Sequence, residues 1–115
     1  MSVMCDTPDR LDIIKPDLDK IVTKIVDNHD PIRIILFGSY ARGTTGKHSD
    51  IDLLVVMDSG KKEGAGARII NTLAFVSDIP QDVVVTTPDD IERIGDDTGY
   101  VIYYALKDGI MLYER

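Results

Sequence analysis

Two short apolar runs in the first half of the chain set the strongest limit on its fold. Residues 32–37 read Ile-Arg-Ile-Ile-Leu-Phe, and residues 51–57 read Ile-Asp-Leu-Leu-Val-Val-Met. Each run is about as long as a buried strand and too short for an ordinary helix. We therefore expect a sheet that contains at least these two strands, the first of them less buried where Arg33 interrupts it.

The segment before the first run predicts a helix, because its apolar residues recur at a spacing of three and four. These residues are Leu11, Ile14, Leu18, Ile21 and Ile25. A proline inside a helix costs about 3 kcal/mol, so we place the start of the main helix near Pro16 and its end within residues 28–31.

The second half of the chain continues the alternation of helices and strands. We expect a mobile connection over residues 58–66, a helix over 67–76 with Ile69, Leu73 and Val76 on one side, and a strand over 82–86. Thr87 caps a further helical region, which runs on to residue 107 and is stopped by Gly109 in a left-handed conformation. A short strand closes the chain at residues 110–113. This order predicts an α/β or α+β fold with a small mixed sheet flanked by helices.

Composition limits the size, location and partners of the protein. With 115 residues of which 43% are apolar, we expect one domain that spans residues 1–115. A net charge of -7 argues against long nucleic acid as the substrate. The lone Cys5 allows neither an internal disulfide nor a cysteine metal site, and no apolar run approaches the ~20 residues of a membrane span. We expect a soluble, cytoplasmic protein without a membrane partner.

Asp50 and Asp52 flank Ile51 where the second apolar run begins, and the two-residue period of a strand places both carboxylates on one face. Two like charges side by side are stabilised by a divalent cation, and magnesium completes its shell with phosphates or water. The alternative is a solvated strand start with ordinary Ser-Asp turn chemistry. A lone Asp-x-Asp motif favours that alternative.

The segment after the first apolar run favours the cation site over the solvated strand start. Gly38 and Ser39 lie where the first strand passes into a short helix over residues 38–43. Glycine allows the backbone to approach a ligand closely, and a helix start offers free N–H groups to phosphate, to which Ser39 adds a hydroxyl. Together, the turn and the paired acids predict a site for a metal-bound phosphate.

The combination of Gly38-Ser39, ten further residues and Asp50-Ile51-Asp52 resembles the signature of the minimal nucleotidyltransferases, which are relatives of DNA polymerase beta. Residues 38–43 and 49–55 match it more fully, and residues 105–109 and 112–114 resemble the usual end of the domain. The likeness covers residues 32–115 and implies the polymerase-beta-like nucleotidyltransferase fold. Asp82, followed by three valines, corresponds to the third carboxylate of the family.

The resemblance implies roles for these residues. Asp50, Asp52 and Asp82 would bind Mg²⁺, with two ions in all, and Asp82 would orient or deprotonate the acceptor hydroxyl. Gly38 and Ser39 would hold the phosphates of ATP, from which AMP moves. Arg42 has two equally weighted roles, namely binding a phosphate or pairing with Asp50 or another local carboxylate to hold the loop.

Other polar and aromatic residues have plainer interpretations. Lys47 and His48 lie in the loop before the acids and are expected to be exposed, and Lys61 and Lys62 are expected to serve solubility. The tyrosines at helical spacing are expected to pack rather than to bind a base; they are Tyr100, Tyr103 and Tyr104.

The resemblance also implies a partner. Stand-alone domains of this family are antitoxins of small helical ribonuclease toxins called HEPN proteins, so the expected acceptor is a tyrosine of such a toxin. A binding module without catalysis is the first alternative, although a pure binding surface has no need of three convergent carboxylates. A transferase acting on a small molecule is the second, and it would normally need an additional substrate-binding domain.

Overall fold

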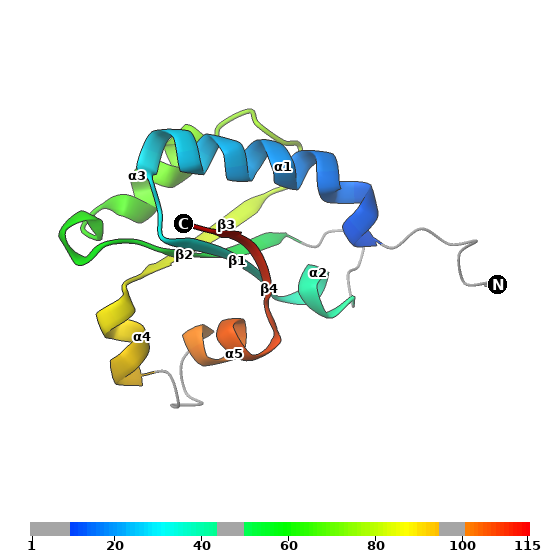
Figure 1. Ribbon diagram of the computed structural model, residues 1–115. Coiled ribbons are helices and arrows are strands. Elements are labelled where there is room, and N and C mark those ends of the chain that lie inside the picture. Colours follow the sequence, from blue (N-terminus) through cyan, green and yellow to red (C-terminus); the bar gives the residue numbers. More distant parts are fainter. Residues whose placement is uncertain (1–9, 44–49, 95–100) are drawn as a thin grey trace.

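The computed structural model describes residues 10–43, 50–94 and 101–115. Four strands form one sheet in the order β3-β2-β1-β4 (Figure 1). They are β1 Arg33–Phe37, β2 Ile51–Val56, β3 Gln81–Thr86 and β4 Ile110–Glu114. β2 runs parallel to β3, whereas β1 is antiparallel to both β2 and β4. The predicted mixed sheet and all four predicted strands are confirmed, with shifts of one residue at some ends.

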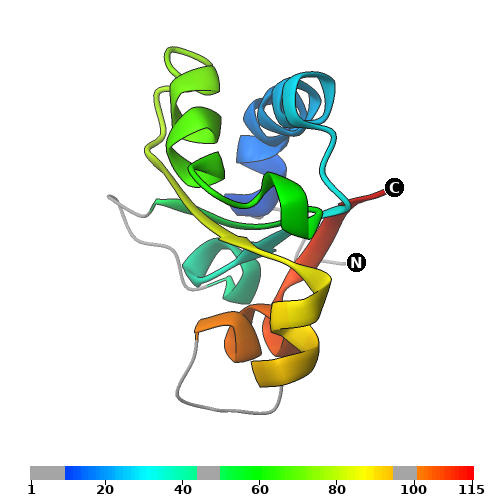
Figure 2. The ribbon, with the colours of Figure 1, turned by 90° about the vertical axis from the view of Figure 1, so that its left-hand side faces the viewer.

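Helices cover both faces of the sheet. α1 Arg10–His29 and α3 Ala65–Thr72 lie on one face, and α4 Pro88–Ile94 and α5 Val101–Asp108 lie on the other (Figure 2). The four-residue helix α2 Ser39–Arg42 follows β1 at the edge of this arrangement. The elements thus form three layers, with a hydrophobic core on each side of the sheet.

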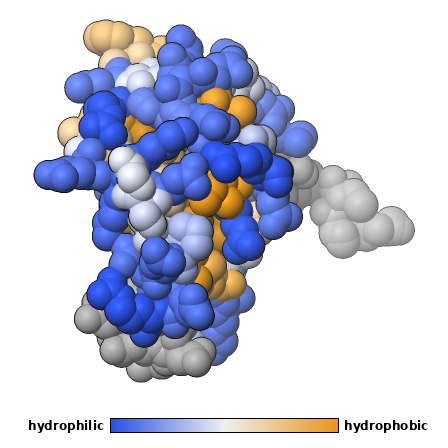
Figure 3. Space-filling model, turned by 60° about the vertical axis from the view of Figure 1, so that its left-hand side comes forward, coloured by the Kyte–Doolittle hydropathy of each residue, from blue (hydrophilic) through white to orange (hydrophobic). Residues whose placement is uncertain are grey.

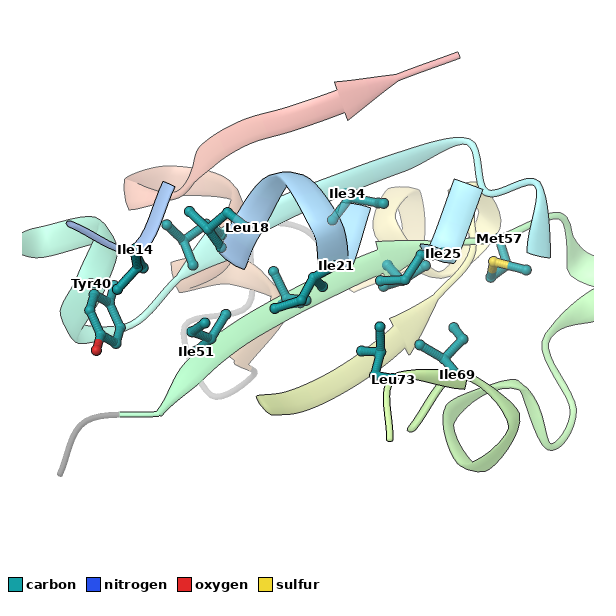
Figure 4. Close-up of a cluster of buried hydrophobic side chains, with 13 residues drawn as sticks. Ile14, Leu18, Ile21, Ile25, Ile34, Tyr40, Ile51, Met57, Ile69 and Leu73 are labelled. Carbon is teal, nitrogen blue, oxygen red and sulfur yellow. The ribbon is translucent and has the colours of Figure 1, made fainter. Parts of the chain in front are cut away.

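The larger core lies between the sheet and α1 (Figure 4). It takes Ile51, Leu53 and Val55 from β2, while Leu54 faces the smaller core under α5. Side chains alternate between the two faces of a strand, so Asp52 projects to the same side as Leu54. The acidic end of β2 therefore faces the side of the sheet that carries α4 and α5.

Helix α1 starts earlier than the sequence predicted. It begins at Arg10 and continues through Pro16, so the prediction of a start near the proline is wrong, whereas the predicted end is confirmed at His29. Ile14 and Leu18, on either side of Pro16, are both buried in the larger core. Burying each stabilises the fold by about 1.5–3 kcal/mol, which offsets the roughly 3 kcal/mol that an interior proline costs.

The helices of the second half also differ from the prediction. α3 ends at Thr72 instead of residue 76, and Phe75 has a positive φ of 65°, which a helix cannot contain. The single helical region predicted from Thr87 to residue 107 contains two helices, with residues 95–100 between them outside the described parts. The cap at Thr87 is confirmed, because Asp90 donates its backbone N–H to the Thr87 hydroxyl at 3.1 Å.

The connection over residues 58–66, which was predicted to be mobile, contains short regular elements. It contains a 3-10 helix, η2 Ser59–Lys61, and α3 already begins at Ala65. Lys62 lies 2.5 Å from a carboxylate oxygen of Asp90, and Lys61 lies 3.7 Å from Asp30. These two lysines therefore tie the connection to α4 and to the end of α1, a role beyond solubility.

Gly109 ends α5 for a different reason than predicted. Its φ is not positive, so the predicted left-handed conformation is wrong. A Cβ atom at this position would lie 2.2 Å from the carbonyl oxygen of Ala105 and 2.5 Å from the Ile35 side chain. Glycine is required because the chain passes against β1 with no room for a side chain.

The surface is largely hydrophilic, with small apolar areas between the polar side chains, on the face shown in Figure 3. Among the helices of the described ranges, none combines the length and the apolar character needed to cross a membrane.

Candidate active site

The candidate site forms where three strands share one end of the sheet. Phe37, the last residue of β1, pairs with Asp52, and Asp52 pairs in turn with Asp82 at the start of β3. Because β1 is antiparallel and β3 is parallel to β2, the end of β1 lies beside the beginnings of the other two strands. The structure thus brings Gly38 and all three predicted carboxylates to one region, although they are distant in sequence.

Gly38 lies directly against the carboxylate of Asp52. Its φ is 77° and its ψ is -155°, a backbone conformation that is essentially restricted to glycine. A Cβ atom built on Gly38 would lie 2.2 Å from Oδ2 of Asp52. Any side chain at position 38 would therefore displace the acid, while the predicted approach of this glycine to a phosphate stays a prediction.

The carboxylates act on one another electrostatically. The pKa of Asp52 is raised above its usual value of 3.8, first by burial and then by the negative charges of Asp82 and Asp50. Arg42 opposes this increase through its positive charge. Asp52 is half-buried, whereas Asp50 and Asp82 are exposed. The cluster therefore concentrates negative charge at a point that protein cations only partly neutralise, and a bound cation would relieve this repulsion.

The three carboxylates do not form a complete metal site by themselves in the described part of the chain. Within the described ranges, no group of three or more His, Cys, Asp or Glu side chains is arranged to hold a metal ion. Magnesium is ordinarily held by one or two carboxylates together with phosphate and water oxygens. The facing pair Asp52 and Asp82, with Asp50 nearby, fits a metal-nucleotide complex better than a metal bound by protein alone.

Helix α2 places the remaining predicted residues beside the acids. Ser39 is its first residue, and the Arg42 N–H donates to the Gly38 carbonyl at 3.1 Å. Arg42 is exposed, and its positive charge acts on Asp52, one of the local carboxylates with which the sequence allowed it to pair. Lys47 and His48 lie outside the described residues.

The larger grooves lie away from the acids. One runs between α1 and β4, and another between α1 and the turn after α3. The acids lie at the beginnings of β2 and β3, outside these two grooves.

Comparison with known proteins identifies the family. Residues 18–112 match the family of nucleotidyltransferase domains. The chain belongs to this family. The predicted minimal nucleotidyltransferase domain and its polymerase-beta-like fold are thereby confirmed.

Individual relatives agree with this assignment. A proposed protein adenylyltransferase of Methanocaldococcus jannaschii is 54% identical over 44 residues, which make up 38% of this chain and 29% of that protein. The match therefore spans less than a third of that relative.

Two solved structures share the fold. The crystal structure of a proposed nucleotidyltransferase from Sulfolobus solfataricus has a TM-score of 0.57 at 22% identity, covering 87% of this chain and 79% of that one. A chain of the MntA-HpeT toxin-antitoxin complex has a TM-score of 0.62 at 26% identity, covering 85% and 72%.

One residue beside the site received no role from the sequence. Tyr40, between Ser39 and Arg42, is only 8% exposed and belongs to the larger core. The available signal was an aromatic residue within an otherwise small and polar segment, Gly-Ser-Tyr-Ala-Arg-Gly.

Proposed function

We propose that this nucleotidyltransferase is magnesium-dependent and moves AMP from ATP to a hydroxyl group of a partner protein. The observation that carries the proposal is the pairing of Asp52 with Asp82 beside Gly38, at one end of the sheet. A half-buried acid that faces other acids binds a divalent cation together with the phosphates that the cation carries.

Different residues of the site would act on ATP and on the acceptor hydroxyl. Asp50 and Asp52 would hold the metal that accompanies the triphosphate, while Gly38, Ser39 and Arg42 face its phosphates. Magnesium supplies charge neutralisation at the reacting phosphate. Asp82 would accept the proton of the acceptor hydroxyl as its oxygen attacks the α-phosphorus, and the bond to pyrophosphate breaks on the opposite side.

A protein acceptor is supported by charge and by the relatives. The net charge of -7 repels a polynucleotide. The name of the Methanocaldococcus relative specifies adenylyl transfer to protein, and another relative was crystallised as part of a toxin-antitoxin complex. A tyrosine of a HEPN-type toxin is the acceptor that we propose, and the cytoplasm is where we expect the reaction.

Intact-mass spectrometry tests the transfer. The chain, magnesium, ATP and a co-encoded HEPN-type toxin should give whole AMP additions on the toxin. These should disappear with Asp52→Asn and persist with Asp78→Asn, a matched change at an exposed acid after α3. AMP additions that persist with Asp52→Asn would mean that this site does not catalyse the transfer. A tight, neutralised complex without added mass would establish the binding-module alternative.

The role of Asp82 has its own test. Because it is placed at the acceptor rather than at the triphosphate, Asp82→Asn should lower the transfer rate by about 10²–10⁴-fold and change ATP affinity little. Calorimetry for affinity and single-turnover mass measurements for rate would separate the two effects. Transfer at the wild-type rate would remove Asp82 from the catalytic group.

A further inference from the structure

Helix α2 is too short to hold its own orientation. It has four residues, and no side chain caps its start, where Gly38 occupies the N-cap position. Isolated helices of far greater length are marginal in water, so contacts with the rest of the protein must fix a helix of this size.

Tyr40 supplies such a contact. It is the buried residue of α2, at 8% exposure, and its ring lies against Ile14 of α1 in the larger core (Figure 4). The first turns of α1 contact α2, and the two helices are neighbours at this edge of the molecule (Figure 1).

Burying Tyr40 also decides where Arg42 points. Successive residues of a helix are rotated by about 100°, so Arg42 lies about 200° from Tyr40, on nearly the opposite side. Tyr40 faces the core, and Arg42 is accordingly exposed. α2 directly follows the end of β1 beside Asp52, and the positive charge of Arg42 acts on Asp52, so Arg42 lies near the acidic cluster.

We infer that Tyr40 is a positioning residue of the nucleotide site: its burial against α1 sets the rotation of α2 and thereby directs Arg42 to the phosphates of the nucleotide. This inference rests on the proposed function. According to this inference, α1 contains none of the proposed catalytic residues but fixes the orientation of α2.

The test measures the affinity for magnesium-ATP by calorimetry, well below the melting temperature of each variant. Tyr40→Ala should weaken binding roughly tenfold, the scale of one lost charge-assisted hydrogen bond. Tyr40→Phe keeps the buried ring and should bind within about twofold of wild type. Tyr40→Leu, which retains apolar volume, replaces the alanine variant if that variant does not fold.

Leu73→Ala is the matched control. Leu73 is 1% exposed and belongs to the same core, but it lies at the end far from Tyr40 (Figure 4). This variant should lose stability like Tyr40→Ala and keep its affinity for the nucleotide. If Leu73→Ala weakens magnesium-ATP binding as much as Tyr40→Ala does, the effect of Tyr40 is a general loss of stability. This result would overturn the inference.

A double-mutant cycle with Arg42→Ala tests whether Tyr40 acts through Arg42. If Tyr40 acts through Arg42, the double variant should bind no more weakly than Arg42→Ala alone. Additive losses, or wild-type affinity in Tyr40→Ala, would overturn the inference and leave the proposed function standing. Absence of magnesium-dependent binding in the wild type would instead overturn the proposed function and, with it, this inference.

Discussion

At Asp52 the requirements of folding and of substrate binding oppose each other. Burial and two neighbouring acids raise the pKa of Asp52, so its ionised form is less favourable in the folded chain than in the unfolded chain. A raised pKa contributes stability that is present below the usual value of 3.8 and is lost as the pH rises through the folded value. At neutral pH, the ionised carboxylate therefore destabilises the fold.

Asp52→Asn should accordingly raise the melting temperature at pH 7 while it abolishes transfer. The gain should shrink as the pH falls through the raised pKa of the folded chain and vanish below 3.8, where the carboxyl group is protonated in both states. Thermal unfolding of both proteins across this pH range provides the measurement. A variant that is less stable than wild type at pH 7 would contradict the electrostatic account.

Gly38 and Gly43 differ both in backbone conformation and in what a side chain would contact. Both have positive φ, at 77° and 74°, but the ψ of Gly38 is -155° and that of Gly43 is 20°, in the left-handed region. A Cβ on Gly38 would strike Asp52, whereas no described atom lies within 4 Å of one on Gly43. Gly43→Ala should cost about 1–2 kcal/mol, the penalty of a left-handed residue. Gly38→Ala should cost about 1–3 kcal/mol more, because its backbone conformation is restricted to glycine and the contact with Asp52 is overpacked.

Denaturant unfolding gives both free energies, and calorimetry should show that Gly38→Ala also loses magnesium-ATP binding. Equal costs at the two positions would mean that Asp52 moves aside freely, in which case Gly38 does not hold the acid in place.

At the scale of elements, local patterns predicted which segments are helices and strands, and packing decided where they end. Pro16 lies within α1 because the residues around it are buried together, and α3 ends at Thr72 because the chain must turn toward β3. Both outcomes depend on the sheet beneath the helices, which no local pattern contains.

The turn after α3 contains a strained and exposed aromatic residue. Phe75 has a φ of 65°, and its side chain is 103% exposed. The left-handed conformation costs a non-glycine residue about 1–2 kcal/mol, while glycine loses about 0.5–1 kcal/mol of extra entropy on folding. Phe75→Gly should therefore leave the free energy of unfolding unchanged or raise it by up to about 1.5 kcal/mol. Chemical denaturation is the measurement, and a loss above about 1 kcal/mol would reveal contacts of the ring.

At the scale of the whole molecule, the candidate site links the ends of three strands, so a bound nucleotide should stabilise the fold as a unit. Magnesium and ATP together, at 100 times the dissociation constant, should add about 2.7 kcal/mol to the free energy of unfolding. Either component alone should add much less, since the metal and the phosphates complete each other's binding.

Differential scanning calorimetry would follow this stabilisation. The double variant Asp50→Asn/Asp52→Asn should show none of it. A shift that persists in this variant would mean that the nucleotide binds elsewhere on the molecule.

The sequence predicted the class of most segments and the residues that we propose to carry the chemistry. Apolar runs of strand length and the helical spacing before them are local properties, and so is the pair of acids around Ile51, which the two-residue period of a strand places on one face. The tertiary structure alone decided that β3 pairs with β2 in a register that sets Asp82 opposite Asp52, and that Gly38 closes against the same carboxylate. Pairing between distant strands depends on the packing of the entire sheet and of the helices on both its faces, so no local pattern specifies it.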